Sequence, residues 1–130
     1  MSSITITLTD HAPIKIKADH WPMIAEATAK DWDGEYEECS DDRSYWHLRV
    51  RQHADGRAVV YADYSHETCF PKQDVAAKRG VMLEADGDII AAIRQVAAEM
   101  AAAKRSDDDD DRWPELAAEC IAHLPAVEIK

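Results

Sequence analysis

Apolar and polar residues alternate along four short stretches of the chain, a pattern typical of half-buried β-strands. The first two stretches, 4–8 and 14–17, are separated by a turn sequence at 10–13. The other two, 46–51 and 57–64, lie on either side of the turn sequence Ala-Asp-Gly. We therefore predict one β-hairpin at the N-terminus and a second in the middle of the chain.

The middle hairpin can form in two registers. A two-residue Asp-Gly turn would place Leu48 opposite Asp63, whereas a three-residue loop with Gly56 at positive φ pairs Leu48 with Ala62. We predict the second register, because it keeps the apolar side chains on one face. It also pairs Val50 with Val60 and Trp46 with Tyr64. The opposite face then carries His47, Arg49, Arg51, Val59, Tyr61 and Asp63.

Apolar residues recur at helical spacing in two later segments. Residues 89–105 carry one apolar stripe, and Asp88 precedes them as a helix cap. Residues 113–124 carry a second stripe, and Pro125 ends it. Both segments are predicted to be amphipathic helices.

A helix start is also predicted near the N-terminus. Residues 19–22 and 111–114 share the pattern Asp-x-Trp-Pro. An aspartate cap followed by proline in the first turn is typical of a helix start. We therefore predict a helix after Asp19, with Trp21, Ile24, Ala25 and Thr28 on one face.

Residues 65–83 leave two alternatives open. Residues 71–79 fit a short helix ending at Gly80, and residues 81–83 either continue it or form a short strand. The order of elements predicts an α+β fold, with an antiparallel sheet of two hairpins and helices packed on one face. The predicted core places Trp46, Leu48, Val50, Val60, Ala62 and Tyr64 against Ile89, Ile93, Val96, Leu116 and Ile121.

Charge is distributed unevenly over a chain that fits one globular domain, 1–130. The formal net charge is −11, and 32% of the residues are charged. Acidic residues fill 31–42 without a basic residue between them, and aspartates occupy 107–111. We predict an exposed acidic loop at 31–44 and an Asp-rich linker at 105–111.

Several stretches resemble small uncharacterised proteins encoded by Mu-like phages and prophages. They are residues 46–57, 88–96, 120–125 and the start of the chain at 4–8 with Trp21 and Pro22. The resemblance implies an accessory protein of a mobile element in a bacterial cytoplasm, and it carries over no catalytic residue. Three scattered cysteines and a start without the features of a signal peptide also favour a cytoplasmic location.

The acidic stretches suggest the leading functional hypothesis. Dense carboxylates on a small domain can imitate a phosphate backbone and occupy a nucleic-acid-binding protein, because charge steers association. The net charge disfavours nucleic acid itself as a partner. We expect no membrane partner, because the chain contains nothing near the ~18 consecutive apolar residues that a membrane span requires. We expect a non-enzymatic accessory protein that binds an unknown, basic protein. The candidate partner-binding residues are Asp31, Asp33, Glu35, Glu37, Glu38, Asp107, Asp108, Asp109 and Asp110.

A nucleic-acid-binding module is the first alternative. Arginines beside a tyrosine can bind phosphate and stack bases. Cross-strand pairing within the sheet accounts for the same side chains without a ligand. The residues of this alternative face are His47, Arg49, Arg51, Arg57 and Tyr61.

A small metal-binding protein is the second alternative. His66 with Cys69 and Cys120 with His123 are spaced i,i+3, and two such pairs can hold zinc. However, Cys120 lies on an apolar helix stripe, where a free cysteine behaves as a small hydrophobic residue. We expect no metal and no cofactor. The sequence also lacks a nucleophile elbow and a glycine-rich phosphate loop, so we expect no catalytic residues.

Overall fold

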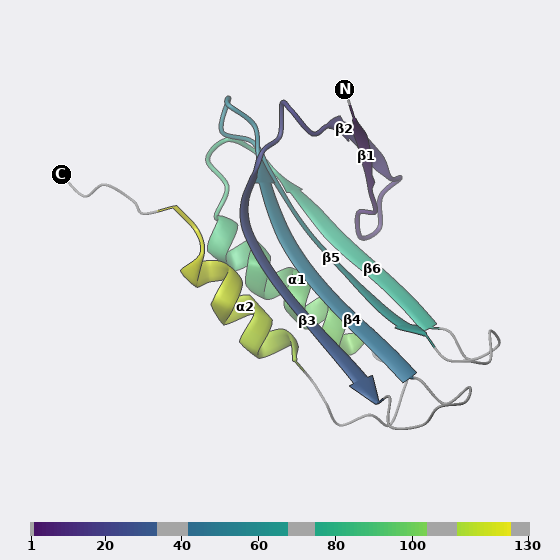
Figure 1. Ribbon diagram of the computed structural model, residues 1–130. Coiled ribbons are helices and arrows are strands. Elements are labelled where there is room, and N and C mark those ends of the chain that lie inside the picture. Colours follow the sequence, from purple (N-terminus) through teal and green to yellow (C-terminus); the bar gives the residue numbers. More distant parts are fainter. Residues whose placement is uncertain (1, 34–41, 68–74, 104–111, 126–130) are drawn as a thin grey trace.

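The computed structural model describes residues 2–33, 42–67, 75–103 and 112–125. Its fold is α+β, as predicted, with helices on one side of an antiparallel sheet and a small hairpin on the other (Figure 1). The strands are β1 (Ser3–Ile6), β2 (Ile14–Lys17), β3 (Met23–Asp33), β4 (Asp42–Gln52), β5 (Ala58–Glu67) and β6 (Val75–Leu83). The helices are α1 (Ile89–Ala102) and α2 (Trp113–Ala122).

The hairpin of β4 and β5 has the predicted register. Leu48 lies opposite Ala62, and the other predicted pairs are also present. Gly56 has a φ of 98° in the connecting loop, and the N–H of His53 donates to the carbonyl of Arg57 at 2.8 Å to close it. A side chain at this φ would be strained, which explains the glycine.

The helix predicted after Asp19 is wrong, because residues 23–33 form strand β3. Ala25 and Ala27 are buried, while the alternate residues Glu26 and Thr28 face the other way. This is a period-two pattern made of alanines, which have little intrinsic preference for strands. Pairing with β4 over the whole length of β3 supplies the hydrogen bonds that select the extended form.

The helix predicted for 71–79 is also wrong where it can be tested. Residues 75–83 form strand β6, which pairs with β5 and places Gly80 opposite Tyr61. Residues 71–74 lie outside the described residues. Pairing with β5 places Ala62 opposite Arg79. It therefore makes a strand of a segment whose sequence had favoured a helix.

The acidic loop predicted at 31–44 is shorter than expected. β3 continues to Asp33 and β4 begins at Asp42, and these two aspartates are partners in the strand register. Residues 34–41 lie outside the described residues, as do residues 104–111, which include the whole of the predicted linker at 105–111. Strands β3 and β4 therefore include residues that we predicted to be in a loop from their charge alone.

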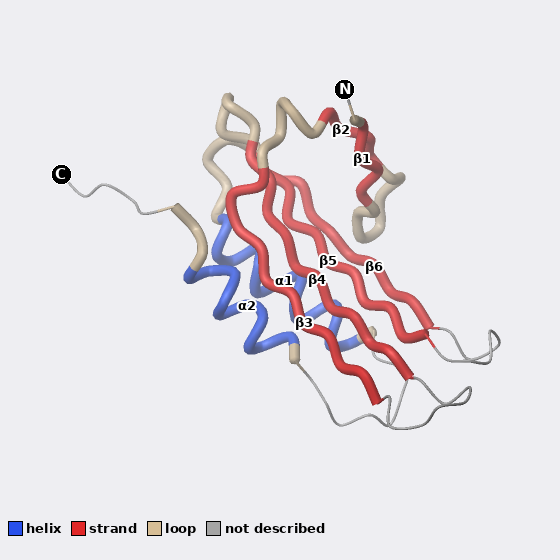
Figure 2. Tube along the Cα trace, viewed as in Figure 1, coloured by secondary structure: helices blue, strands red, loops and turns tan. Residues whose placement is uncertain are grey.

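The two helices cover one face of the β3–β6 sheet (Figure 2). Asp88 caps α1 as predicted, its Oδ1 accepting from the N–H of Ala91 at 3.1 Å. The predicted core is confirmed, with Leu48, Val60 and Ile93 almost completely buried. Tyr64, Ile89 and Ile121 join the same cluster as partly buried members.

The N-terminal hairpin does not extend the main sheet but lies across its other face. Ile6, Leu8, Ile16 and Trp21 form a second apolar cluster around Val59 of β5. Val59 was predicted on the face opposite the core, and the hairpin explains why it is nevertheless fully buried. The hairpin thus covers this face at β5 and β6, while Thr28 on β3 stays exposed.

Candidate functional site

The sheet face opposite the helices carries the residues of the predicted nucleic-acid face, except Arg57. Arg49 makes three contacts on this face. Its Nε donates to Glu26 Oε2 at 2.7 Å, and its Nη1 lies 4.0 Å from Asp63 Oδ2. Its Nη2 is 3.1 Å from Nδ1 of His47. The guanidinium is therefore paired within the sheet.

Arg51 joins the sheet to the segment before β3. Its Nε donates to the hydroxyl of Tyr61 at 2.9 Å, and its Nη1 donates to the carbonyl of Trp21 at 3.0 Å. The predicted register partners of this face are confirmed. Between β4 and β5 the side chains contact diagonally, Arg51 to Tyr61 and Arg49 to Asp63, whereas Arg49 bonds directly across to Glu26, its register partner on β3. Arg51 and Tyr61 thus connect strands β4 and β5 with the segment that precedes β3.

Arg57 lies apart from this face, in the loop between β4 and β5. Its Nε donates to Asp55 Oδ2 at 2.8 Å, and its guanidinium carbon lies 5.2 Å from the ring centre of Trp21. The backbone N–H of Arg57 donates to Asp55 and lowers the pKa of that carboxyl. Asp55 also lies 3.2 Å from Nδ1 of His53.

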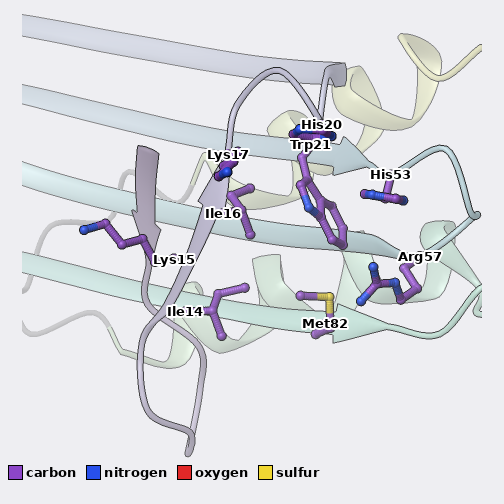
Figure 3. Close-up of a pocket in the computed structure, with 9 residues that line it drawn as sticks. All are labelled: Ile14, Lys15, Ile16, Lys17, His20, Trp21, His53, Arg57 and Met82. Atoms are coloured by element: carbon purple, nitrogen blue, oxygen red, sulfur yellow. The ribbon is translucent and has the colours of Figure 1, made fainter. Parts of the chain in front are cut away.

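Beside Arg57 the surface is hollowed between β2 and this loop (Figure 3). Lys15, Lys17, His20 and His53 line the hollow together with Arg57 and Trp21. Sequence reasoning missed this grouping, because the residues come from two segments more than thirty positions apart. The alternation of lysines with isoleucines in β2 was the available signal, and it indicated only a solvated strand face.

The candidate partner-binding carboxylates fall into two groups. Asp31 and Asp33 belong to β3, where they are paired in register with Ser44 and Asp42. The others, Glu35, Glu37, Glu38 and Asp107 to Asp110, lie outside the described residues. Strands β3 and β4 flank the first acidic stretch, and helices α1 and α2 flank the second. The ends of these elements that adjoin the acidic stretches lie toward one end of the sheet (Figure 1).

The cysteine and histidine pairs of the metal alternative are only partly described, because Cys69 lies outside. Cys120 is fully buried in α2, and burial raises the pKa of its thiol to about 11, with the charges of Glu119 and Glu26 acting in the same direction. Nδ1 of His123 lies 2.7 Å from the carbonyl oxygen of Glu26. Within the described ranges no three His, Cys, Asp or Glu side chains form a metal-binding group.

One serine–histidine pair was not anticipated. Ser44 Oγ lies 2.7 Å from Nδ1 of His66, its direct cross-strand partner, and 3.5 Å from the hydroxyl of Tyr64. Ser44 is buried. A buried hydroxyl needs such partners, so the contact has a structural explanation that requires no nucleophilic chemistry.

Comparison with known proteins does not add a function to these observations. No family model, curated protein or solved structure matches the chain. In the described part of the chain, neither helix is long and apolar enough to cross a membrane.

Proposed function

We propose that this protein is a non-enzymatic accessory factor that binds a basic protein through its acidic end. The acidic end denotes the end of the sheet where β3 finishes and β4 begins. The observation that carries the proposal is that elements flanking both acidic stretches of the sequence converge there. A phage or prophage setting is part of the proposal and rests on the sequence resemblance alone.

The contacts of β3 and α2 support this arrangement. β3 ends at Asp33, opposite Asp42 at the start of β4. α2 runs back along β3, since His123 after its last turn contacts Glu26, near the start of that strand. The first turn of α2 therefore points toward the acidic end.

The start of α2 is held there by an aromatic contact. The guanidinium carbon of Arg112 lies 5.0 Å from the ring centre of Trp46, and Trp46 is the register partner of Ala29. α1 also ends toward the same side of the molecule (Figure 1). Stretches 31–42 and 107–111 are thus joined to neighbouring elements rather than to opposite ends of the domain.

Grouped carboxylates favour a basic partner for an electrostatic reason. Charges of one sign at one end add to a common field that raises the association rate of an oppositely charged partner. The alternative face for nucleic acid is less suitable, because Arg49 and Arg51 already bond to groups of the same molecule. The net charge of −11 would also repel a phosphate backbone.

The test is capture from a bacterial lysate by the immobilised protein, followed by mass spectrometry and binding kinetics on the captured protein. A variant with Asp107→Asn, Asp108→Asn and Asp109→Asn tests the acidic end. We expect it to associate at least roughly threefold more slowly than wild type at low salt. Added salt should remove the difference, because it screens charges beyond a Debye length of about 8 Å.

A matched control removes three charges elsewhere, by Asp19→Asn, Glu84→Gln and Asp86→Asn. These residues are exposed and lie away from the acidic end, so the control should associate like wild type. Equal reductions of the association rate in both variants, or an association rate that does not depend on salt, would contradict the proposal. Salt-sensitive gel shifts with DNA would instead favour the nucleic-acid alternative.

A further inference from the structure

A positively charged hollow lies between β2 and the β4–β5 loop, in a protein whose net charge is −11. Its volume is about 380 Å³. Its polar lining consists of basic or imidazole side chains, those of Lys15, Lys17, His20, His53 and Arg57, and no carboxylate lines it (Figure 3). A concentration of cationic groups on an acidic domain is the opposite of what average composition predicts, and it favours an anionic ligand.

The positive charges of Lys15 and Lys17 take no part in stabilising the fold. Lys15 and Lys17 are exposed, whereas Ile16 between them is buried against the sheet. Neither lysine has an ion-pair partner in the described ranges. This separates them from Arg49, which is bound to Glu26 at 2.7 Å.

Arg57 is held in place on the other side of the hollow. Asp55 accepts from its Nε at 2.8 Å, and the guanidinium lies over the Trp21 ring. Among the described residues the Arg57 side chain bonds to no group other than Asp55, whereas the Arg49 guanidinium contacts Glu26, Asp63 and His47. A side chain held in this way loses less freedom when it binds a ligand. Arginine and lysine together are well suited to phosphate, since one offers a planar set of donors and the other a compact charge.

A second hollow, of about 660 Å³, adjoins the first and shares His20 and His53 with it. Its remaining lining includes Pro22, Ile24 and Ala54, together with one carboxylate, that of Asp19, whose Oδ2 lies 3.9 Å from Nε2 of His20. It therefore carries no excess of positive charge. The shared imidazole rings are nearly parallel, with 14° between their planes and 6.4 Å between their centres. The cationic hollow and the less polar hollow thus meet at the imidazole rings of His20 and His53.

We propose that these joined hollows bind a nucleotide. Its phosphates would lie between Lys17 and Arg57, since Lys15 is directed away from the other lining side chains (Figure 3), and its base would pack against the imidazole of His53 and the apolar lining of the second hollow. Both volumes fall in the range of small-molecule sites, about 300–1,000 Å³. The ligand can be a free nucleotide or a residue of a single strand, because both offer phosphate beside a base. This site is independent of the acidic end.

The test is isothermal titration calorimetry of the full chain at low salt with four probes. They are adenosine triphosphate, tripolyphosphate, adenosine and a short single-stranded oligoadenylate. We expect adenosine triphosphate to bind more tightly than tripolyphosphate or adenosine, because only it fills both hollows. Tighter binding of the oligoadenylate would identify a single strand as the source of the ligand, and weaker binding a free nucleotide.

The variant Lys15→Gln with Lys17→Gln should weaken binding of adenosine triphosphate by about tenfold. The control Lys78→Gln with Arg94→Gln removes the same charge from exposed or half-exposed positions outside both hollows and should change the affinity by less than about twofold. As a readout independent of the variants, amide resonances of Lys15, His53 and Arg57 should shift when wild type is titrated.

Three results would overturn the site. They are the absence of binding by the nucleotide probes, equal affinity for tripolyphosphate and adenosine triphosphate, and equal losses in the lysine variant and its control. A resonance map that leaves residues 15–20 and 53–57 unmoved would do the same. Loss of capture in the acidic-end variants would not affect these outcomes, so the two proposals fail separately.

Discussion

Arg49 and Arg51 carry the same charge as Lys15 and Lys17, yet neighbouring groups give the two pairs different uses. Arg49 is bound to Glu26 and Arg51 to Tyr61 and the Trp21 carbonyl. The lysines extend from the exposed side of β2. The charge of a side chain follows from its type, but whether the charge is free for a ligand depends on which neighbours the fold brings near it.

Cys120 gives a prediction at the scale of one residue. It is fully buried and its thiol has a pKa of about 11, so the reactive thiolate is scarce and inaccessible. We expect iodoacetamide at about pH 8 to leave Cys120 unmodified in the folded protein and to modify it in urea. Mass spectrometry of the peptide containing Cys120 measures this.

The same shift predicts a pH effect on stability. The folded pKa lies above the ordinary value of 9.0, so burial of the neutral thiol stabilises the fold below pH 9.0. That contribution is lost as pH rises from 9.0 to about 11. The stability difference between wild type and Cys120→Ala should shrink over this interval. Rapid labelling of Cys120 under native conditions would contradict its burial.

Strands β3 and β6 show how an element depends on its partner. Ala25, Ala27 and Ala77 are weak strand formers, and both segments are strands because neighbouring strands pair with them. Gly80 marks a second tertiary constraint on β6. The N–H of Thr9 donates to the carbonyl of Gly80 at 2.8 Å, so the N-terminal chain crosses β6 at close range.

Gly80→Ala tests this crossing. A Cβ at position 80 would lie 2.6 Å from the carbonyl oxygen of Thr7, which forces the hairpin away from the sheet. We expect a loss of about 1–3 kcal/mol in the free energy of unfolding, measured with urea. Cleavage by protease near residues 7–18 should also become faster.

The control for this substitution is Lys78→Ala, an exposed change on the same strand that should be nearly neutral. Glycine-to-alanine changes at unconstrained sites raise stability, because they reduce the freedom of the unfolded chain. A gain in stability for Gly80→Ala would therefore show that the hairpin does not press on β6.

At the scale of the molecule, charge is the feature that distinguishes one end from another. The helices cover one sheet face and the N-terminal hairpin covers part of the other, in two separate apolar clusters. Neither cluster contains an ionised side chain. The net charge of −11 therefore resides on surfaces and opposes compaction through self-repulsion.

This repulsion predicts that the melting temperature rises when sodium chloride is added. Salt screens like charges and so favours the compact state. The variant Asp107→Asn, Asp108→Asn and Asp109→Asn should have nearly the same stability as wild type and a weaker dependence on salt. A melting temperature that falls with salt would indicate that attractive ion pairs outweigh the repulsion.

The sequence by itself determined the α+β class, the register of the β4–β5 hairpin and both helices. These features follow from short-range periodicity, since alternation around Gly56 and helical spacing after Asp88 each describe a buried face. Tertiary structure decided that the alanine-rich segment 23–33 and residues 75–83 are strands, because their hydrogen-bond partners lie elsewhere in the chain. It also placed the N-terminal hairpin over Val59. Only that packing brings β2 beside Arg57, since residues distant in sequence meet where apolar burial draws their elements together.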